Sequence, residues 1–149
     1  MRARFPTLTA ILVLLAGPAA ADSCGDLIDR VVAETQATLV KRTADFAEFS
    51  GPDGIGMTLA CGELSATGVQ FRGTPLPAGY FELFGRAGHA VTGLAADDLA
   101  QAARTARTAA ATTRHSNVDA GKVLVTCSLS GTREAPVTAC AVIERDERR

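Results

Sequence analysis

The sequence predicts an α+β domain, with an antiparallel sheet of about five strands and helices packed mainly on one face. Strand-like segments lie next to one another along the chain instead of alternating singly with helices, which favours hairpins over βαβ units. Four cysteines behind an export signal predict two disulfides that stabilise this domain. The expected element order is α-β-β-β-α-α-β-β, which argues against a doubly wound nucleotide-binding fold.

Residues 1–21 have the features of a cleavable secretory signal peptide in their usual order. Two arginines precede an apolar run over 8–16, and small alanines follow at the positions that a signal peptidase reads. The run is about half as long as a membrane span, so cleavage is favoured over anchoring. We expect cleavage between Ala21 and Asp22, and a mature domain of residues 22–149 that is periplasmic or secreted. The Gly-, Ala- and Arg-rich composition is typical of a GC-rich bacterial genome, which favours the periplasm.

The mature domain is expected to be mildly acidic. Removing Arg2 and Arg4 leaves 13 basic residues against 16 acidic ones, a formal charge of −3. Such a domain binds nucleic acid poorly without a basic patch. The chain has no Trp and a single Tyr, so aromatic platforms for stacking bases or sugars are scarce.

The four cysteines are Cys24, Cys61, Cys127 and Cys140. No C-x-x-C spacing occurs, so thioredoxin-like redox chemistry and the common zinc motifs are not expected. Three pairings are possible for four cysteines. We prefer Cys24–Cys61 with Cys127–Cys140, because a hairpin turn near 131–134 would set the last two cysteines opposite each other. Structural bridges are the main expectation, and a reactive thiol is the alternative.

The first half of the mature domain is expected to contain one helix and three strands. Apolar residues recur at helical spacing over 25–38. Residues 40–49 alternate loosely as a strand, and the Gly-Pro-Asp-Gly sequence at 51–54 predicts a turn. Strands over 55–61 and 67–72 follow, each with apolar and small or polar side chains on opposite faces.

A second helix is expected over 77–91. Tyr80, Phe81 and Phe84 lie on its apolar side, where they pack into the core or, as the alternative, line an apolar ligand groove. Three glycines weaken this helix by about 1 kcal/mol each relative to alanine but permit close backbone approach: Gly79, Gly85 and Gly88.

An alanine-rich third helix is expected over 95–114. Its basic residues Arg104, Arg107 and Arg114 fall within about 80° of one another on a helical wheel. Such a set is either a solvated face or a site for phosphate, sulfate or an acidic partner. A loop at 116–121 and a hairpin of strands 122–129 and 135–144 complete the domain. The charged tail over 145–149 is expected to be frayed.

The two histidines are the main candidates for catalysis. His89 and His115 each fall near the end of an expected helix, where a cationic side chain is favoured for structural reasons. The chain lacks G-x-S-x-G, H-E-x-x-H, P-loop and G-x-G-x-x-G motifs and the spacing of a calcium loop. We therefore assign no catalytic, metal or cofactor-binding residue and expect no cofactor.

These residues and spacings identify no characterised family, so function is inferred from the motifs that are present and absent. The leading hypothesis is a non-enzymatic binding or accessory protein of the bacterial envelope, with an unknown protein or small ligand as its partner. Any ligand would lie between the second helix and the sheet, near Tyr80, Phe81 and Phe84. The alternatives are a small secreted hydrolase that uses His115 or His89, and an inhibitor or protein-interaction domain that uses the loop over 73–79.

Overall fold

The computed structural model describes residues 23–146. The predicted signal peptide, its cleavage site and residues 147–149 lie outside this range. In chain order the elements are α1 (Ser23–Thr35), β1 (Thr38–Arg42), β2 (Phe46–Ser50), a 3₁₀ turn η1 (Pro52–Gly54), β3 (Gly56–Ala60), β4 (Ala66–Arg72), α2 (Tyr80–Thr92), α3 (Ala96–Thr113), β5 (His115–Ala120), β6 (Val123–Gly131) and β7 (Pro136–Glu144). Within the described range, no helix combines the length and the apolar character needed to cross a membrane.

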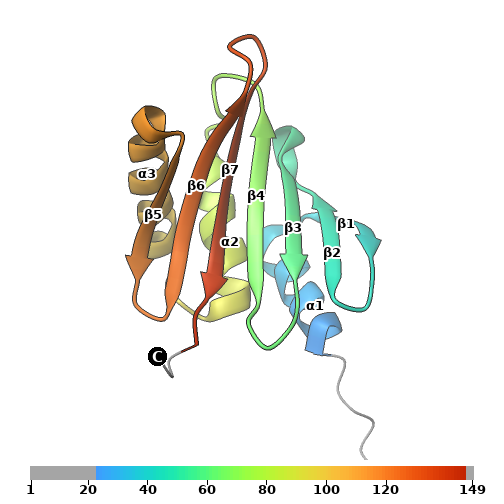
Figure 1. Cartoon of the computed structure of the whole chain (residues 1–149). Helices are drawn as coiled ribbons and strands as arrows, with labels where there is room; N and C mark the ends of the chain where they lie inside the picture. The colour runs from blue at the N-terminus through green and yellow to red at the C-terminus, as the bar shows by residue number, and fades with distance from the viewer. Residues whose placement is uncertain (1–22, 147–149) are drawn as a thin grey trace, which may run out of the picture.

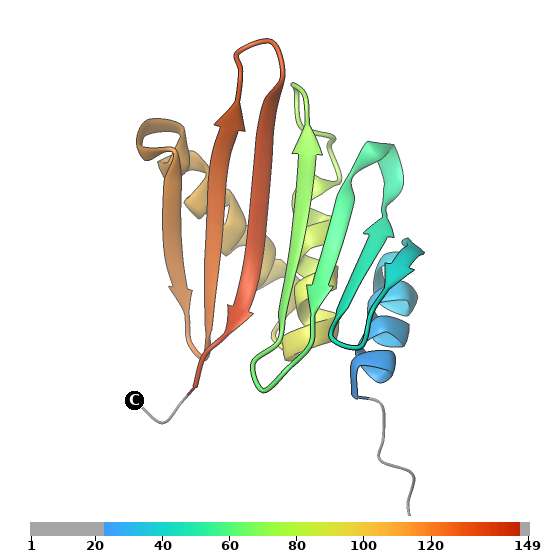
Figure 2. The ribbon, with the colours of Figure 1, turned by 45° about the vertical axis from the view of Figure 1, so that its right-hand side comes forward.

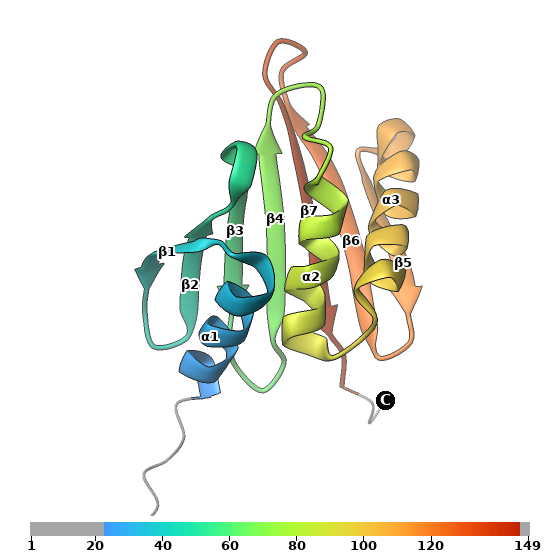
Figure 3. The same cartoon turned by 180° about the vertical axis from the view of Figure 1, so that it is seen from behind.

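The strands form one seven-stranded sheet in the order β1-β2-β3-β4-β7-β6-β5. All six pairings are antiparallel. The three helices lie side by side on one face of the sheet, and its other face carries no helix within the described residues (Figures 1, 2 and 3). The predicted α+β class and one-sided helix layer are therefore confirmed, whereas the predicted count of five strands is wrong by two.

The first additional strand arises where one long strand was expected over 40–49. The chain reverses at Thr43–Asp45 and forms a hairpin of β1 and β2. The backbone N–H of Thr43 donates to the Phe46 carbonyl at 2.8 Å, and the Thr43 hydroxyl contacts the Asp45 carboxylate at 3.1 Å. Short polar side chains that bond their own backbone favour such turns, and this Thr-Ala-Asp signal was missed.

The second additional strand is β5, where a loop was expected over 116–121. Its six residues pair continuously with β6. The polar residues His115, Asn117 and Asp119 are exposed, whereas Ser116, Val118 and Ala120 are half-buried. An edge strand that packs on a helix needs only one modestly apolar side. Pairing with β6 therefore makes this segment a strand, although its composition favours a turn.

One disulfide ties the helix layer to the sheet, and the other joins two neighbouring strands within the sheet. Cys24 in α1 is bonded to Cys61 directly after β3, and Cys127 in β6 is bonded to Cys140 in β7. Cys127 and Cys140 are also direct register partners in the β6–β7 hairpin, as expected from a turn near 131–134. Both bridges are those preferred from the sequence, and the described residues include no free cysteine.

The closest contact in the helix layer joins α2 to α3. A methyl group on Gly85 would lie well inside the van der Waals contact distance to the Ala96 carbonyl oxygen, and one on Gly88 would lie 2.7 Å from a Leu99 methyl carbon. The absence of side chains here allows α3 to sit close enough for Leu99 and Ala103 to be completely buried. Gly79, in contrast, has open space around it.

We predict that Gly85→Ala destabilises the domain by about 1–3 kcal/mol, despite the better helix propensity of alanine, because the added methyl group meets backbone that cannot rotate away. The matched Gly79→Ala variant should change the free energy of unfolding by less than about 1 kcal/mol. Urea denaturation with the disulfides intact measures both. Equal stability of the two variants would contradict the close α2–α3 contact.

Candidate functional site

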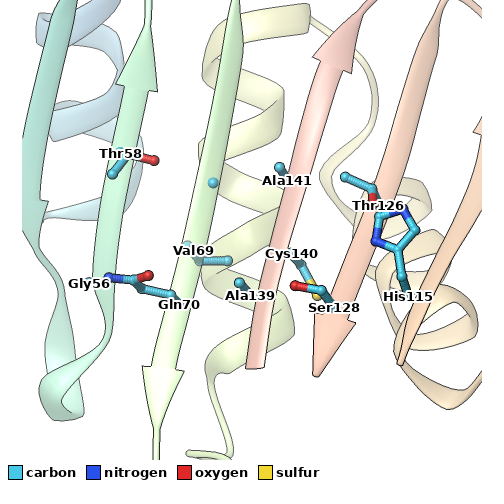
Figure 4. Close-up of a pocket in the computed structure, with 11 residues that line it drawn as sticks. Gly56, Thr58, Val69, Gln70, His115, Thr126, Ser128, Ala139, Cys140 and Ala141 are labelled. Carbon is cyan, nitrogen blue, oxygen red and sulfur yellow. Dashed lines mark hydrogen bonds between the residues drawn. The ribbon is translucent and has the colours of Figure 1, made fainter. Parts of the chain in front are cut away.

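The uncovered face of the sheet contains a hollow of about 250 Å³ (Figure 4). Strand register brings its parts together, since direct partners in neighbouring strands share a face. Gly68 in β4 is the partner of Ala141 in β7, and Gln70 is the partner of Ala139. The small residues of this set form the floor of the hollow, across the middle strands of the sheet.

The walls of the hollow come from larger polar side chains on either side of this floor. Thr58 and Gln70 lie on the β3 side, and Thr126, Ser128 and His115 lie on the opposite side (Figure 4). All of these side chains carry hydrogen-bonding groups, and His115 is the only ionisable one among the lining residues. The full lining is Gly56, Thr58, Gly68, Val69, Gln70, His115, Thr126, Ser128, Ala139, Cys140 and Ala141.

The two strand glycines are the least expected residues of this face. Gly68 lies inside β4, and Gly56 is the first residue of β3. Glycine in a strand costs stability and commonly marks a place where a ligand or another backbone comes close. Neither residue has a positive φ, so backbone conformation does not require glycine at either position. The small side chains of this face were visible in the sequence, but only the register shows that Gly68 and Ala141 are neighbours.

Of the two histidines, only His115 lies at this site. Its Nε2 atom is 3.4 Å from the Thr126 hydroxyl, and Ser128 is its register partner in β6. His115 begins β5 instead of ending a helix, which corrects its expected position. The Nδ1 atom of His89 lies 2.8 Å from the Leu94 carbonyl beyond the end of α2, the helix-end location expected from the sequence.

The aromatic residues of α2 do not form an open groove. Tyr80 and Phe84 are completely buried between α2 and the sheet. Phe81 is half-buried, and its ring packs edge-on against Tyr80 at a centroid distance of 5.2 Å. Tyr80 and Phe84 therefore belong to the core, and Phe81 belongs to its rim.

The arginines of α3 do not present a common open face. The Arg104 guanidinium pairs with Glu82 of α2 and lies 4.7 Å above the centre of the Phe81 ring. Arg107 is half-buried, and its Nε atom has no hydrogen-bond partner among the described residues. Arg114 lies beyond α3 in a left-handed conformation, with a φ of 67°, and is exposed. The turn at Arg114 therefore removes it from the helical row predicted for the three residues.

Among residues 23–146, no group of three or more His, Cys, Asp or Glu side chains is placed to hold a metal ion. Comparisons of the chain with protein-family models, with characterised proteins and with solved structures return no match. Function therefore has to be inferred from the chemistry of the uncovered sheet face.

Tyr80 is the one described group with a strongly displaced ionisation equilibrium. Burial raises the pKa of its hydroxyl well above the ordinary value, and a backbone hydrogen bond at Cys140 and the nearby Arg107 offset this only in part. The hydroxyl donates to the Val69 carbonyl at 2.9 Å. Tyr80 thus stays protonated and holds α2 against β4.

We predict that the folded domain loses stability above pH about 10, because tyrosine then ionises in the unfolded chain but not at buried Tyr80. Below that pH, Tyr80 is neutral in both the folded and the unfolded chain, and its full contribution to the free energy of unfolding is present. The Tyr80→Phe variant should lose about 1 kcal/mol at pH 7 and depend less on pH above 10. Urea denaturation over this range measures the effect. Because the chain has a single Tyr, tyrosinate absorbance reports this group alone, and ionisation near pH 10 in the folded protein would contradict the prediction.

Proposed function

We propose that this chain is an exported, non-enzymatic binding or accessory protein of the bacterial envelope that holds a short uncharged peptide segment on the uncovered face of its sheet. The observation that supports this most is the Gly68–Ala141 floor at the centre of that face. Side chains of this size leave room for another backbone to approach the sheet closely.

The chemistry of the walls suits an amide ligand. A peptide group needs one hydrogen-bond acceptor and one donor, and Gln70, Thr126 and Ser128 offer both. The lining contains no lysine, arginine or carboxylate that could form an ion pair with a charged ligand. Sugars commonly stack on Phe, Tyr or Trp rings, and the lining contains none of these residues. The volume of about 250 Å³ fits a few residues of a partner better than a large small-molecule ligand.

One observation favours the alternative of a small secreted hydrolase. His115 lies beside Thr126 within the hollow, as a base lies beside a nucleophile. The 3.4 Å separation is longer than a well-formed hydrogen bond. A triad also requires an acid that orients the histidine, and no hydrogen bond between His115 and a carboxylate is observed in residues 23–146. These features favour His115 as a polar wall residue.

We predict that acetyl-trialanine amide, used as a neutral peptide probe, binds weakly over the hollow. In NMR titrations at millimolar concentration, the largest shift changes should fall on the amides of Gly68, Ser128 and Ala141. The Ala141→Phe variant fills the floor and should weaken binding by at least about tenfold. Its thermal stability should change little, since this face is open to water.

The Ile143→Phe variant is the matched control, because it adds the same ring to the same strand and face, outside the hollow. It should bind the probe as the wild type does. Shift changes scattered over the surface, or unaltered by Ala141→Phe, would overturn the binding proposal. Cleavage of the probe that disappears in His115→Ala would instead establish the hydrolase alternative.

A further inference from the structure

The two edges of the sheet differ in how well they resist pairing with another strand. At one edge, β1 has five residues, a register shift within its pairing to β2, and the basic residues Lys41 and Arg42. Short length, irregular pairing and basic side chains all discourage strand addition. At the other edge, β5 pairs regularly with β6 over all six residues and contains neither lysine, arginine nor proline. Among the described residues, β5 has no strand on its outer side.

We propose that β5 pairs with β5 of a second copy of this chain, so that two sheets join into one continuous antiparallel sheet. The partner is argued from the sequence of the strand itself. In an antiparallel pair related by a two-fold axis, residues at equal distances on either side of the axis are cross-strand partners and share a face of the sheet. We place the axis at Asn117. Asn117 then faces its own copy, and His115 of each chain faces Asp119 of the other.

This register is complementary in hydrogen bonding, because an imidazole N–H can donate to a carboxylate. His115 and Asp119 are both exposed on the uncovered face, where a second chain can reach them from outside the sheet edge. Asp119 already pairs with Arg145 of its own chain. Its exposed carboxylate has further acceptor positions for the imidazole of the second copy. The two Asn117 amides can bond to each other, because each has a donor and an acceptor.

Helix α3 supplies a second, independent surface for the same pairing. It covers β5 and β6, and its α2-facing side carries Ala96, Ala100 and Arg104. The opposite side of the helix projects outward past β5, and the helical period places Thr105, Ala109 and Thr112 there. All three residues are small and exposed. This flank can therefore come close to another helix.

The spacing of the two copies agrees with helix packing. Neighbouring strands lie about 4.8 Å apart, and α3 lies over the gap between β5 and β6. Two α3 helices across the two-fold axis would then be two strand spacings apart, or about 10 Å, which is a normal distance between packed helices. The axis also makes the helices antiparallel, which aligns their dipoles favourably. Sheet and helix layers can thus continue across the interface together.

The register is tested by cross-linking the exported, purified chain under oxidising conditions. Residues facing themselves across the axis have Cα atoms within disulfide reach. Asn117→Cys should therefore give a covalent dimer on a non-reducing gel, whereas Asp119→Cys alone should not. The double variant H115C/D119C should cross-link again, because these positions face each other between chains. Equal cross-linking of N117C and D119C would overturn the proposed register.

Sedimentation of the wild-type protein should give twice the monomer mass. Asn117→Lys, which sets like charges against each other, and Ala109→Arg, which blocks approach of the helices, should each weaken the dimer at least about tenfold. Val40→Lys at the β1 edge is the control and should leave the dimer intact. None of the three residues lines the hollow, so peptide binding reports separately on the proposed function. A wild-type protein that stays monomeric at all concentrations would overturn the proposal.

Discussion

Coverage of the sheet on one side only is the constraint on which the rest of the structure depends. Seven strands present a wide apolar face, and three helices have to cover it. The coverage succeeds because α2 and α3 approach closely at Gly85 and Gly88, where no side chain separates them. Alanines such as Ala103 and Ala106 can then fill the space under α3 completely. A larger residue at Gly85 would move α3 away from the strands it covers.

One-sided coverage also explains the side chains of the uncovered face, because these have to be compatible with water. Most of its central residues are small or carry hydroxyl or amide groups, and they are half-buried or exposed. Solubility alone would be met equally well by threonine or lysine, which also suit a strand better than glycine does. A Cβ atom on Gly68 would lie 3.3 Å from the Thr58 hydroxyl oxygen and 3.4 Å from the Cys140 carbonyl oxygen, so glycine keeps the centre of this face uncrowded. It is at this centre that we propose ligand binding.

The two edges of the sheet differ in how well they are protected against pairing with another strand. A sheet that is open on one face and at both ends needs protection against unwanted pairing. The β1 edge has this protection in its bulge and basic residues. The β5 edge has a regular backbone and a sequence that is complementary to itself about Asn117. Ligand binding would centre on β4 and β7 and self-association on β5, and His115 at the start of β5 would belong to both surfaces.

The sequence by itself determined the elements whose signals are local or covalent. Helical spacing, the Gly-Pro-Asp-Gly turn and the alternation in β3 and β4 fixed most elements to within a few residues, and the cysteine spacing indicated the observed bridges. The hairpin at Thr43–Asp45 and the strand β5 were missed. In the first case a weak turn signal lay within a loosely alternating segment that was expected to be one strand, and in the second a polar segment became a strand only through its partner.

The tertiary structure alone decided the site. Arg104 and Phe81 had each seemed available to a ligand, but contacts between α2 and α3 engage them with each other. Tyr80 and Phe84 fill the core because the sheet lies directly against them. Gly68 and Ala141 are far apart in the chain and become neighbours only through the β4–β7 pairing. Long-range register has no local signature in one sequence, so the hollow that carries the proposed function could be found only in the folded chain.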